Sequence, residues 1–118
     1  MTNESIMQIE QQDNGNIVIL MIEGQLVANN AYLLKNQFNR LITEKPDFVI
    51  DLARMDYIDS TGLGALVSCL RSATENKGTI KICCLQNKPR MLFDITKAYK
   101  IFDIYETREQ AVASFAGN

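Results

Sequence analysis

The chain has 118 residues, of which 47% are hydrophobic and 22% are charged, and its net charge is -2. This length and composition are typical of one soluble domain with a sizeable core, here residues 1–118. The weak negative net charge gives no electrostatic footprint for nucleic acid, so we expect no nucleic-acid partner. No apolar run approaches the roughly 18 residues of a membrane span.

The residue types that the chain lacks exclude several kinds of catalytic and metal site. The chain contains no histidine, which excludes the Ser-His-Asp triad, the Cys-His pair and imidazole metal ligands. Three cysteines, Cys69, Cys83 and Cys84, have no metal-ligand spacing, and their odd number favours reduced thiols. Residues 1–5 lack the basic and apolar regions of an export signal. We therefore expect a cytoplasmic protein with no cofactor and no metal.

The first half of the chain predicts three strands and one helix. Residues 6–12 and 16–23 are strand-like, and the Asp-Asn-Gly turn between them predicts an antiparallel hairpin. Residues 30–44 place apolar side chains at helical spacing. Residues 48–52 form a continuous apolar run, which is typical of a strand buried on both faces.

The second half predicts two more strands and three helices. A helix over 62–76 precedes a strand over 79–85. The next helix opens at residue 87 and presents three apolar side chains, Met91, Leu92 and Ile95. A short strand at 101–105 and a capping box at 107–110 predict the last strand and a final helix. The order implies an α/β domain, with a mostly parallel sheet of about five strands flanked by about four helices.

Two smaller features of the second half have simple structural interpretations. Cys83 and Cys84 are adjacent on a predicted strand, so we expect their side chains on opposite faces, as core or surface thiols. Asn87, Lys88 and Arg90 lie near a predicted helix start. Solvation explains these three polar side chains more simply than a partner surface does.

The segment 56–66 is the most informative part of the chain, because acidic residues, two hydroxyls and two glycines gather where a strand leads into a helix. The unpaired N–H groups and the dipole of a helix start attract negative charge. Any residue of 59–61 can cap the helix. Two adjacent hydroxyls exceed what one cap needs, and Gly64 costs roughly 1 kcal/mol relative to alanine. Such departures from local rules favour a functional role, and a hydroxyl at this place can either cap the helix or accept a phosphoryl group.

Residues 59–64, Asp-Ser-Thr-Gly-Leu-Gly, resemble the signature of bacterial anti-sigma factor antagonists, which are small proteins of the STAS fold. The resemblance extends through nearly the whole chain. Further matches are Gly24, the pair 51–52, residues 55–58 and residues 91–96. The resemblance implies the STAS fold and a protein-binding regulator that is not an enzyme.

The resemblance also implies how such a regulator works. In that family a histidine-kinase-like serine/threonine kinase, which is also the anti-sigma factor, phosphorylates a hydroxyl of this motif. By resemblance the acceptor is Ser60, with Thr61 as the alternative. The unmodified form binds the kinase and frees its client, the phosphorylated form releases the kinase, and a metal-dependent serine phosphatase resets the cycle. The implied partner-binding residues are Asp56, Asp59, Ser60, Thr61, Gly62, Leu63 and Gly64.

Two other classes of protein have some of the same sequence features. A response-regulator receiver domain would use Asp51 as its acceptor, and it needs an acidic pair that holds a metal ion. Glu23 has no suitable acidic neighbour, so the receiver interpretation fails. A STAS scaffold or transporter-associated subunit would use the same surface without phosphorylation. Hydroxyls at both Ser60 and Thr61 favour the phosphorylated regulator, and the scaffold stays as the alternative.

Overall fold

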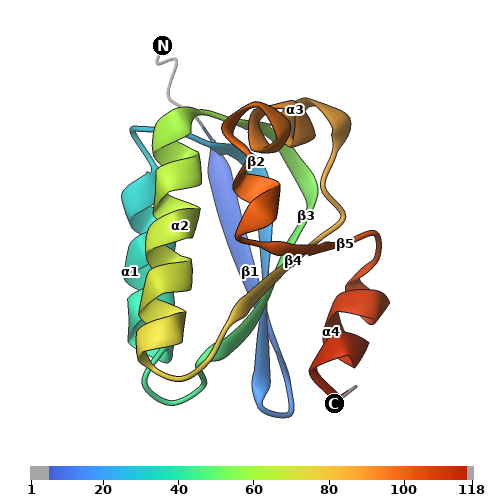
Figure 1. Ribbon diagram of the computed structural model, residues 1–118. Helices are drawn as coiled ribbons and strands as arrows, with labels where there is room; N and C mark the ends of the chain where they lie inside the picture. The colour runs from blue at the N-terminus through green and yellow to red at the C-terminus, as the bar shows by residue number, and fades with distance from the viewer. Residues whose placement is uncertain (1–5, 117–118) are drawn as a thin grey trace.

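The computed structural model describes residues 6–116; segment 1–5, which bears on the export signal, lies outside this range. Five strands form one sheet in the order β1-β2-β3-β4-β5 (Figure 1). The strands are β1 (Met7–Asn14), β2 (Ile17–Leu26), β3 (Asp47–Ile58), β4 (Ile80–Cys83) and β5 (Asp103–Tyr105). The helices are α1 (Ala31–Leu41), α2 (Ser60–Glu75), α3 (Asn87–Thr96), the short 3-10 helix η1 (Ala98–Lys100) and α4 (Arg108–Ala116).

The sheet is mixed, with one antiparallel pair at its edge. β1 pairs with β2 in antiparallel orientation, and β2 to β5 are parallel to one another. Helices α1 and α2 lie side by side over one face of the sheet, and α4 lies on the other side (Figure 1). This arrangement confirms the predicted α/β fold. Within the described range no helix is both long and apolar enough to cross a membrane.

The central strand β3 is buried on both faces, as its continuous apolar run predicts. Phe48, Ile50 and Leu52 belong to the main core beneath α1, α2 and α3. The ring of Phe48 lies 4.3 Å from that of Phe38 on α1, measured between centroids. Val49 faces the other way and joins the smaller core under α4. The strand therefore fixes both helical layers to one sheet.

Strands β2 and β3 extend further than the sequence predicts. The predicted strand 48–52 continues to Ile58, because Met55 and Ile58 remain buried while the residues between them are exposed. β2 continues past Gly24, whose φ of 95° is a left-handed value that favours glycine. The pairing of the two strands shifts register on either side of Gly24. Consequently Asp56 lies on a strand and not in the loop before α2.

Helix α3 contacts the core through a different face from the one predicted. Met91 and Ile95 are 61% and 75% exposed, so two of the three expected apolar positions point into solvent. Pro89 and Phe93 are the buried residues of the helix, four residues apart and therefore on one face. The Phe93 ring packs 6.0 Å from that of Phe102, between centroids, just before β5.

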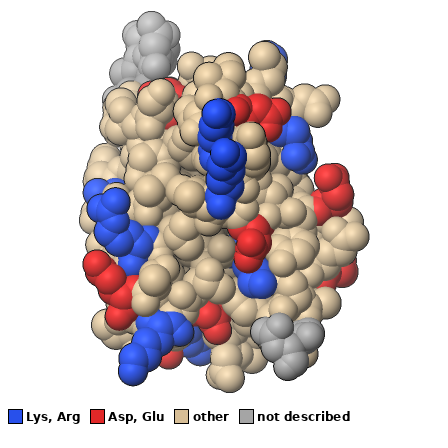
Figure 2. Space-filling model, viewed as in Figure 1, with Lys and Arg blue, Asp and Glu red and all other residues tan. Residues whose placement is uncertain are grey.

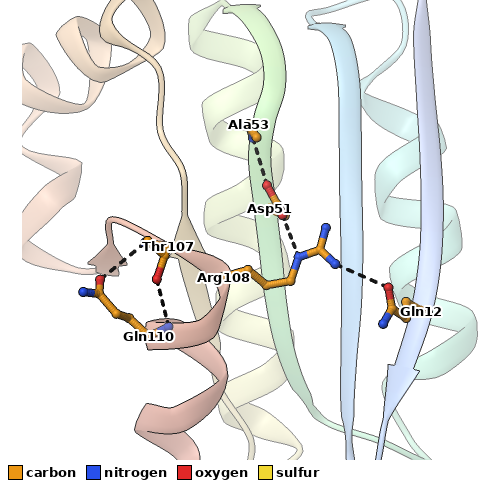
Figure 3. A network of polar contacts seen from close by, with 6 residues as sticks. All are labelled: Gln12, Asp51, Ala53, Thr107, Arg108 and Gln110. Atoms are coloured by element: carbon orange, nitrogen blue, oxygen red, sulfur yellow. Dashed lines mark hydrogen bonds and ion pairs between the residues drawn. The ribbon is translucent and has the colours of Figure 1, made fainter.

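A polar network joins α4 to the middle of the sheet (Figure 3). The Asp51 carboxylate is buried, and its Oδ2 accepts a 2.8 Å hydrogen bond from Nε of Arg108, while Oδ1 accepts from the Ala53 amide. The predicted capping box is present: the Gln110 amide donates to the Thr107 hydroxyl, and the Thr107 amide to the Gln110 side chain. Asp51 thus lies within β3 as a structural ion-pair partner.

Replacing Arg108 by leucine should lower the free energy of unfolding by about 2–3 kcal/mol, because it leaves the Asp51 carboxylate buried without its cation. Urea unfolding measures the change. Lys45→Leu is the matched control, since its 3.3 Å ion pair with Asp13 is exposed and should contribute little. Equal stability of the Arg108→Leu variant and the unmodified protein would contradict this account of the network.

Candidate functional site

Asp59 is the residue that begins α2. It has an extended backbone, and its Oδ1 accepts a 2.7 Å hydrogen bond from the Gly62 amide, so it is the N-cap of the helix. Its Oδ2 accepts a second bond, of 3.1 Å, from the Ala28 amide in the loop between β2 and α1. One carboxylate therefore joins two segments that lie 31 residues apart in the sequence.

The β2–α1 loop is also held by Asn30. Its side-chain oxygen accepts from the Val27 amide at 3.0 Å, and its amide nitrogen donates to the Gln25 carbonyl at 2.9 Å. Asn30 is itself buried, so these bonds satisfy a polar group inside the fold. Together with Asp59, Asn30 gives this loop a fixed shape beside the start of α2.

Because Asp59 is the cap, the two hydroxyls of the motif are left free. Ser60 and Thr61 are the first two residues of α2, and both are exposed. Within residues 6–116 neither hydroxyl makes a hydrogen bond. The first N–H groups of a helix have no carbonyl partner within it and can donate to an anion. The site therefore presents two hydroxyl groups that the described part of the fold does not use.

The two glycines of the motif have different roles. A Cβ on Gly62 would collide with the Leu26 carbonyl oxygen, so this glycine permits close packing of α2 on the end of β2. A Cβ on Gly64 would meet no atom within 4 Å, and this residue is exposed. The fold gives no reason for Gly64 to lack a side chain. Its small size leaves the surface open for another molecule to approach the backbone.

The residues predicted to bind a partner divide into two groups. Leu63 and Gly62 are buried, and Asp59 uses both carboxylate oxygens within the fold, so these three position the site. The remaining members are exposed: Asp56, Ser60, Thr61 and Gly64.

Two open grooves adjoin these exposed residues. We call the first the α1–α2 groove; it is lined by Ala28, Ala31, Tyr32, Lys35, Thr61, Gly64, Ala65 and Ser68. We call the second the β3–α3 groove; it is lined by Gln25, Asp56, Tyr57, Gln86, Asn87 and Lys88. The groove volumes are about 390 and 530 Å³, and each contains one lysine. The surface around the hydroxyls is therefore less acidic than the sequence alone suggests.

Most groove residues outside the motif were missed by the sequence analysis. Tyr32 and Tyr57 are 58% and 49% exposed. Tyr57 belongs to the segment 55–58 that the resemblance matched, whereas no signal in the sequence pointed to Tyr32. Asn87 and Lys88, whose polar side chains the sequence analysis attributed to solvation, lie together with Asp56 in the β3–α3 groove. Arg90 is not among its lining residues and donates to the Leu85 carbonyl at 3.2 Å.

Gln86 fixes the shape of the β3–α3 groove. Its side-chain nitrogen donates to the Ala53 carbonyl at 2.7 Å and to the Met55 carbonyl at 3.1 Å, and both carbonyls belong to β3. These bonds attach the start of α3 to the strand that leads into the motif.

Across the face shown in Figure 2, charges of both signs are interspersed and form no extended basic area.

Comparison with known proteins identifies the family. The family model described as STAS domain matches residues 8–111. The chain belongs to the STAS domain family. It is 30% identical over 104 residues to the anti-sigma-B factor antagonist of Bacillus subtilis (strain 168), across 88% of this chain and 95% of that protein.

Solved structures show the same fold. An anti-sigma factor antagonist from Mycobacterium paratuberculosis superposes with a TM-score of 0.83 at 19% identity, covering 92% of this STAS domain and 93% of that chain. The Bacillus cell fate determinant SpoIIAA in its phosphorylated form has a TM-score of 0.72 at 16% identity, covering 93% and 99% of the two chains.

The prediction that Cys83 and Cys84 point to opposite faces was wrong. β4 ends at Cys83, and Cys84 has a left-handed backbone with a φ of 63°. This turn brings the two thiols and the Asp51 carboxylate together, with the sulfur and oxygen atoms within 4.8 Å of one another. Strand alternation fails here because Cys84 has left the strand.

Alanine at the two glycines should have opposite effects on this STAS domain. Gly62→Ala should lower the free energy of unfolding by about 2–3 kcal/mol, because the new methyl group collides with the Leu26 backbone. Gly64→Ala should raise it by up to about 1 kcal/mol, because alanine is the better helix former and meets open space. Chemical denaturation measures both. If Gly64→Ala destabilises the domain, Gly64 has a structural role that the geometry does not reveal.

Proposed function

We propose that this STAS domain is an anti-sigma factor antagonist that acts by partner switching in the cytoplasm. One observation is the main support: Asp59 caps α2, so the hydroxyls of Ser60 and Thr61 are exposed and unused by the fold. A helix start with a free hydroxyl is a suitable place for a reversible negative charge. The similarity to the anti-sigma-B factor antagonist supports the same function.

We assign Ser60 as the phosphorylated residue and Thr61 as the alternative. The partner that phosphorylates it is an anti-sigma factor with serine/threonine kinase activity. Thr61 lines the α1–α2 groove beside Gly64, which suits a contact residue, whereas Ser60 lines neither groove. The exposed contact set is Asp56, Ser60, Thr61 and Gly64, and the buried motif residues hold this set in place.

Phosphorylation switches binding through local charge and size. A phosphate adds about -1.5 to -2 charges and three acceptor oxygens. The free amides at the start of α2 can donate hydrogen bonds to the phosphate oxygens, so the fold does not need to rearrange. A partner surface shaped for a neutral hydroxyl then faces steric exclusion and desolvation. A loss of about 2–3 kcal/mol weakens binding roughly 30- to 150-fold.

The cycle has three steps. The unmodified domain binds the anti-sigma factor and releases its client, which activates transcription by the freed sigma factor. Kinase activity of the bound anti-sigma factor then moves the γ-phosphate of ATP to the Ser60 oxygen, and the serine proton leaves as ADP is released. A metal-dependent serine phosphatase hydrolyses the phosphoserine and restores binding.

The test uses the anti-sigma kinases encoded in the same genome. Each is incubated with ATP and the full chain, and any added phosphate is located by mass spectrometry. We expect one phosphate at Ser60, none on Ser60→Ala, and continued phosphorylation of Thr61→Ala. Calorimetry should show the phosphorylated protein and Ser60→Asp binding the kinase 30- to 150-fold more weakly than the unmodified chain, a loss of about 2–3 kcal/mol.

The variants show which hydroxyl is the acceptor, and they distinguish the phosphorylation switch from the scaffold function. Ser60→Ala should retain kinase binding, because the hydroxyl is unused by the fold and its loss adds no charge. If both hydroxyls stay unmodified with every kinase and Ser60→Asp binds as tightly as the unmodified chain, the switch proposal fails. That result would favour the scaffold or transporter-associated alternative.

A further inference from the structure

The smaller core contains a cluster of metal-ligating groups that lies apart from the start of α2. Cys83 ends β4 and is fully buried, Cys84 follows it and is half-buried, and Asp51 lies on the neighbouring strand β3. One ligand atom from each residue lies within 4.8 Å of the other two. We propose that Asp51, Cys83 and Cys84 bind a thiophilic divalent cation of the zinc type.

The spacing of these atoms suits such an ion. Zinc binds thiolate sulfur at about 2.3 Å in tetrahedral geometry, which places two ligand sulfurs roughly 3.8 Å apart. The two sulfurs need to close by about 1 Å at most to reach that separation. Thiolates select soft or borderline ions, whereas magnesium and calcium prefer all-oxygen sites. Two sulfurs and one carboxylate oxygen therefore favour zinc over the hard cations.

The backbone supports this placement of the sulfurs. In an extended conformation the Cys84 side chain would point away from Cys83, and the left-handed φ of 63° turns it back. A left-handed backbone costs a non-glycine residue about 1–2 kcal/mol. The Cys84 amide also donates to the Tyr105 carbonyl of β5 at 3.1 Å, which holds the turn in place.

The surrounding charges allow a divalent ion to bind without changing the net charge of the buried site. Binding breaks the two S–H bonds, forms two metal–sulfur bonds and releases two protons to solvent as the cation enters. The charge of the buried site is therefore unchanged, and Arg108 continues to neutralise Asp51.

Each oxygen of Asp51 already accepts one hydrogen bond, Oδ1 from the Ala53 amide and Oδ2 from Arg108, and each keeps a second lone pair for a metal ion. Oδ2 of Asp51 accepts from Arg108, which can hold the carboxylate in place as an outer partner of the metal. Asp51 and Arg108 also line a cavity of about 110 Å³ together with Met21 and Glu23, but neither cysteine lines it. The ligands that the structure supplies are therefore the three side chains themselves.

The test titrates Co²⁺ and then Zn²⁺ into the reduced full-length protein in oxygen-free buffer. We expect a thiolate-to-cobalt charge-transfer band in the near ultraviolet, which Zn²⁺ abolishes by displacement. Cys84→Asn should show a weaker band, because Cys83 remains as a single thiolate ligand, and it should bind Zn²⁺ on the order of 100-fold more weakly, since loss of even an outer partner costs about 10–100-fold. Asparagine tolerates the left-handed backbone, so this variant should fold without metal.

Cys69→Ala is the matched control, because Cys69 is a buried cysteine on α2 in the main core. It should keep both the cobalt band and the zinc affinity. Equal zinc affinity of the unmodified protein and Cys84→Asn, or the absence of any thiolate band, would overturn the proposal. Phosphorylation at Ser60 is measured separately, and the two proposals succeed or fail independently.

Discussion

The site depends on the carboxylate of Asp59 more than on any other group. Its two oxygens bind the Gly62 amide at the start of α2 and the Ala28 amide in the β2–α1 loop. These bonds fix the angle at which the chain leaves β3 and enters the helix. They also satisfy a helix-start amide that the hydroxyl of Ser60 or Thr61 could otherwise have bound. With Asp59 as the cap, both hydroxyls remain available to another protein.

This division of roles explains the composition of the six-residue motif. Gly62 and Leu63 lie against the core and let α2 approach the end of β2, while Gly64 faces open space. A contiguous stretch of sequence thus alternates between supporting the fold and presenting a surface. A switch placed on such a rigid helix start can change affinity without a change of fold, because charge and size are altered at one exposed point.

The sequence predicted the elements better than their edges and faces. Hydrophobic periodicity correctly indicated the sheet, the hairpin and the helices, since burial of apolar side chains decides these features. It missed the extension of β3 to Ile58, because register with β2 is set by tertiary pairing around Gly24. It also missed the left-handed turn at Cys84 and the grooves, which form only when β3, α1, α2 and α3 are assembled. The capping box at 107–110 was predicted correctly because it is a local interaction.

The most direct test of the central claim is amide hydrogen exchange at Gly62 and Ala28, before and after phosphorylation. Both amides donate to Asp59, so their protection reports on the two hydrogen bonds that this carboxylate accepts. The account predicts that both stay protected to the same degree when Ser60 carries a phosphate, while affinity for the anti-sigma factor falls. Faster exchange at either amide in the phosphorylated protein would show that the cap rearranges, and it would contradict the claim that the switch acts on a fixed fold.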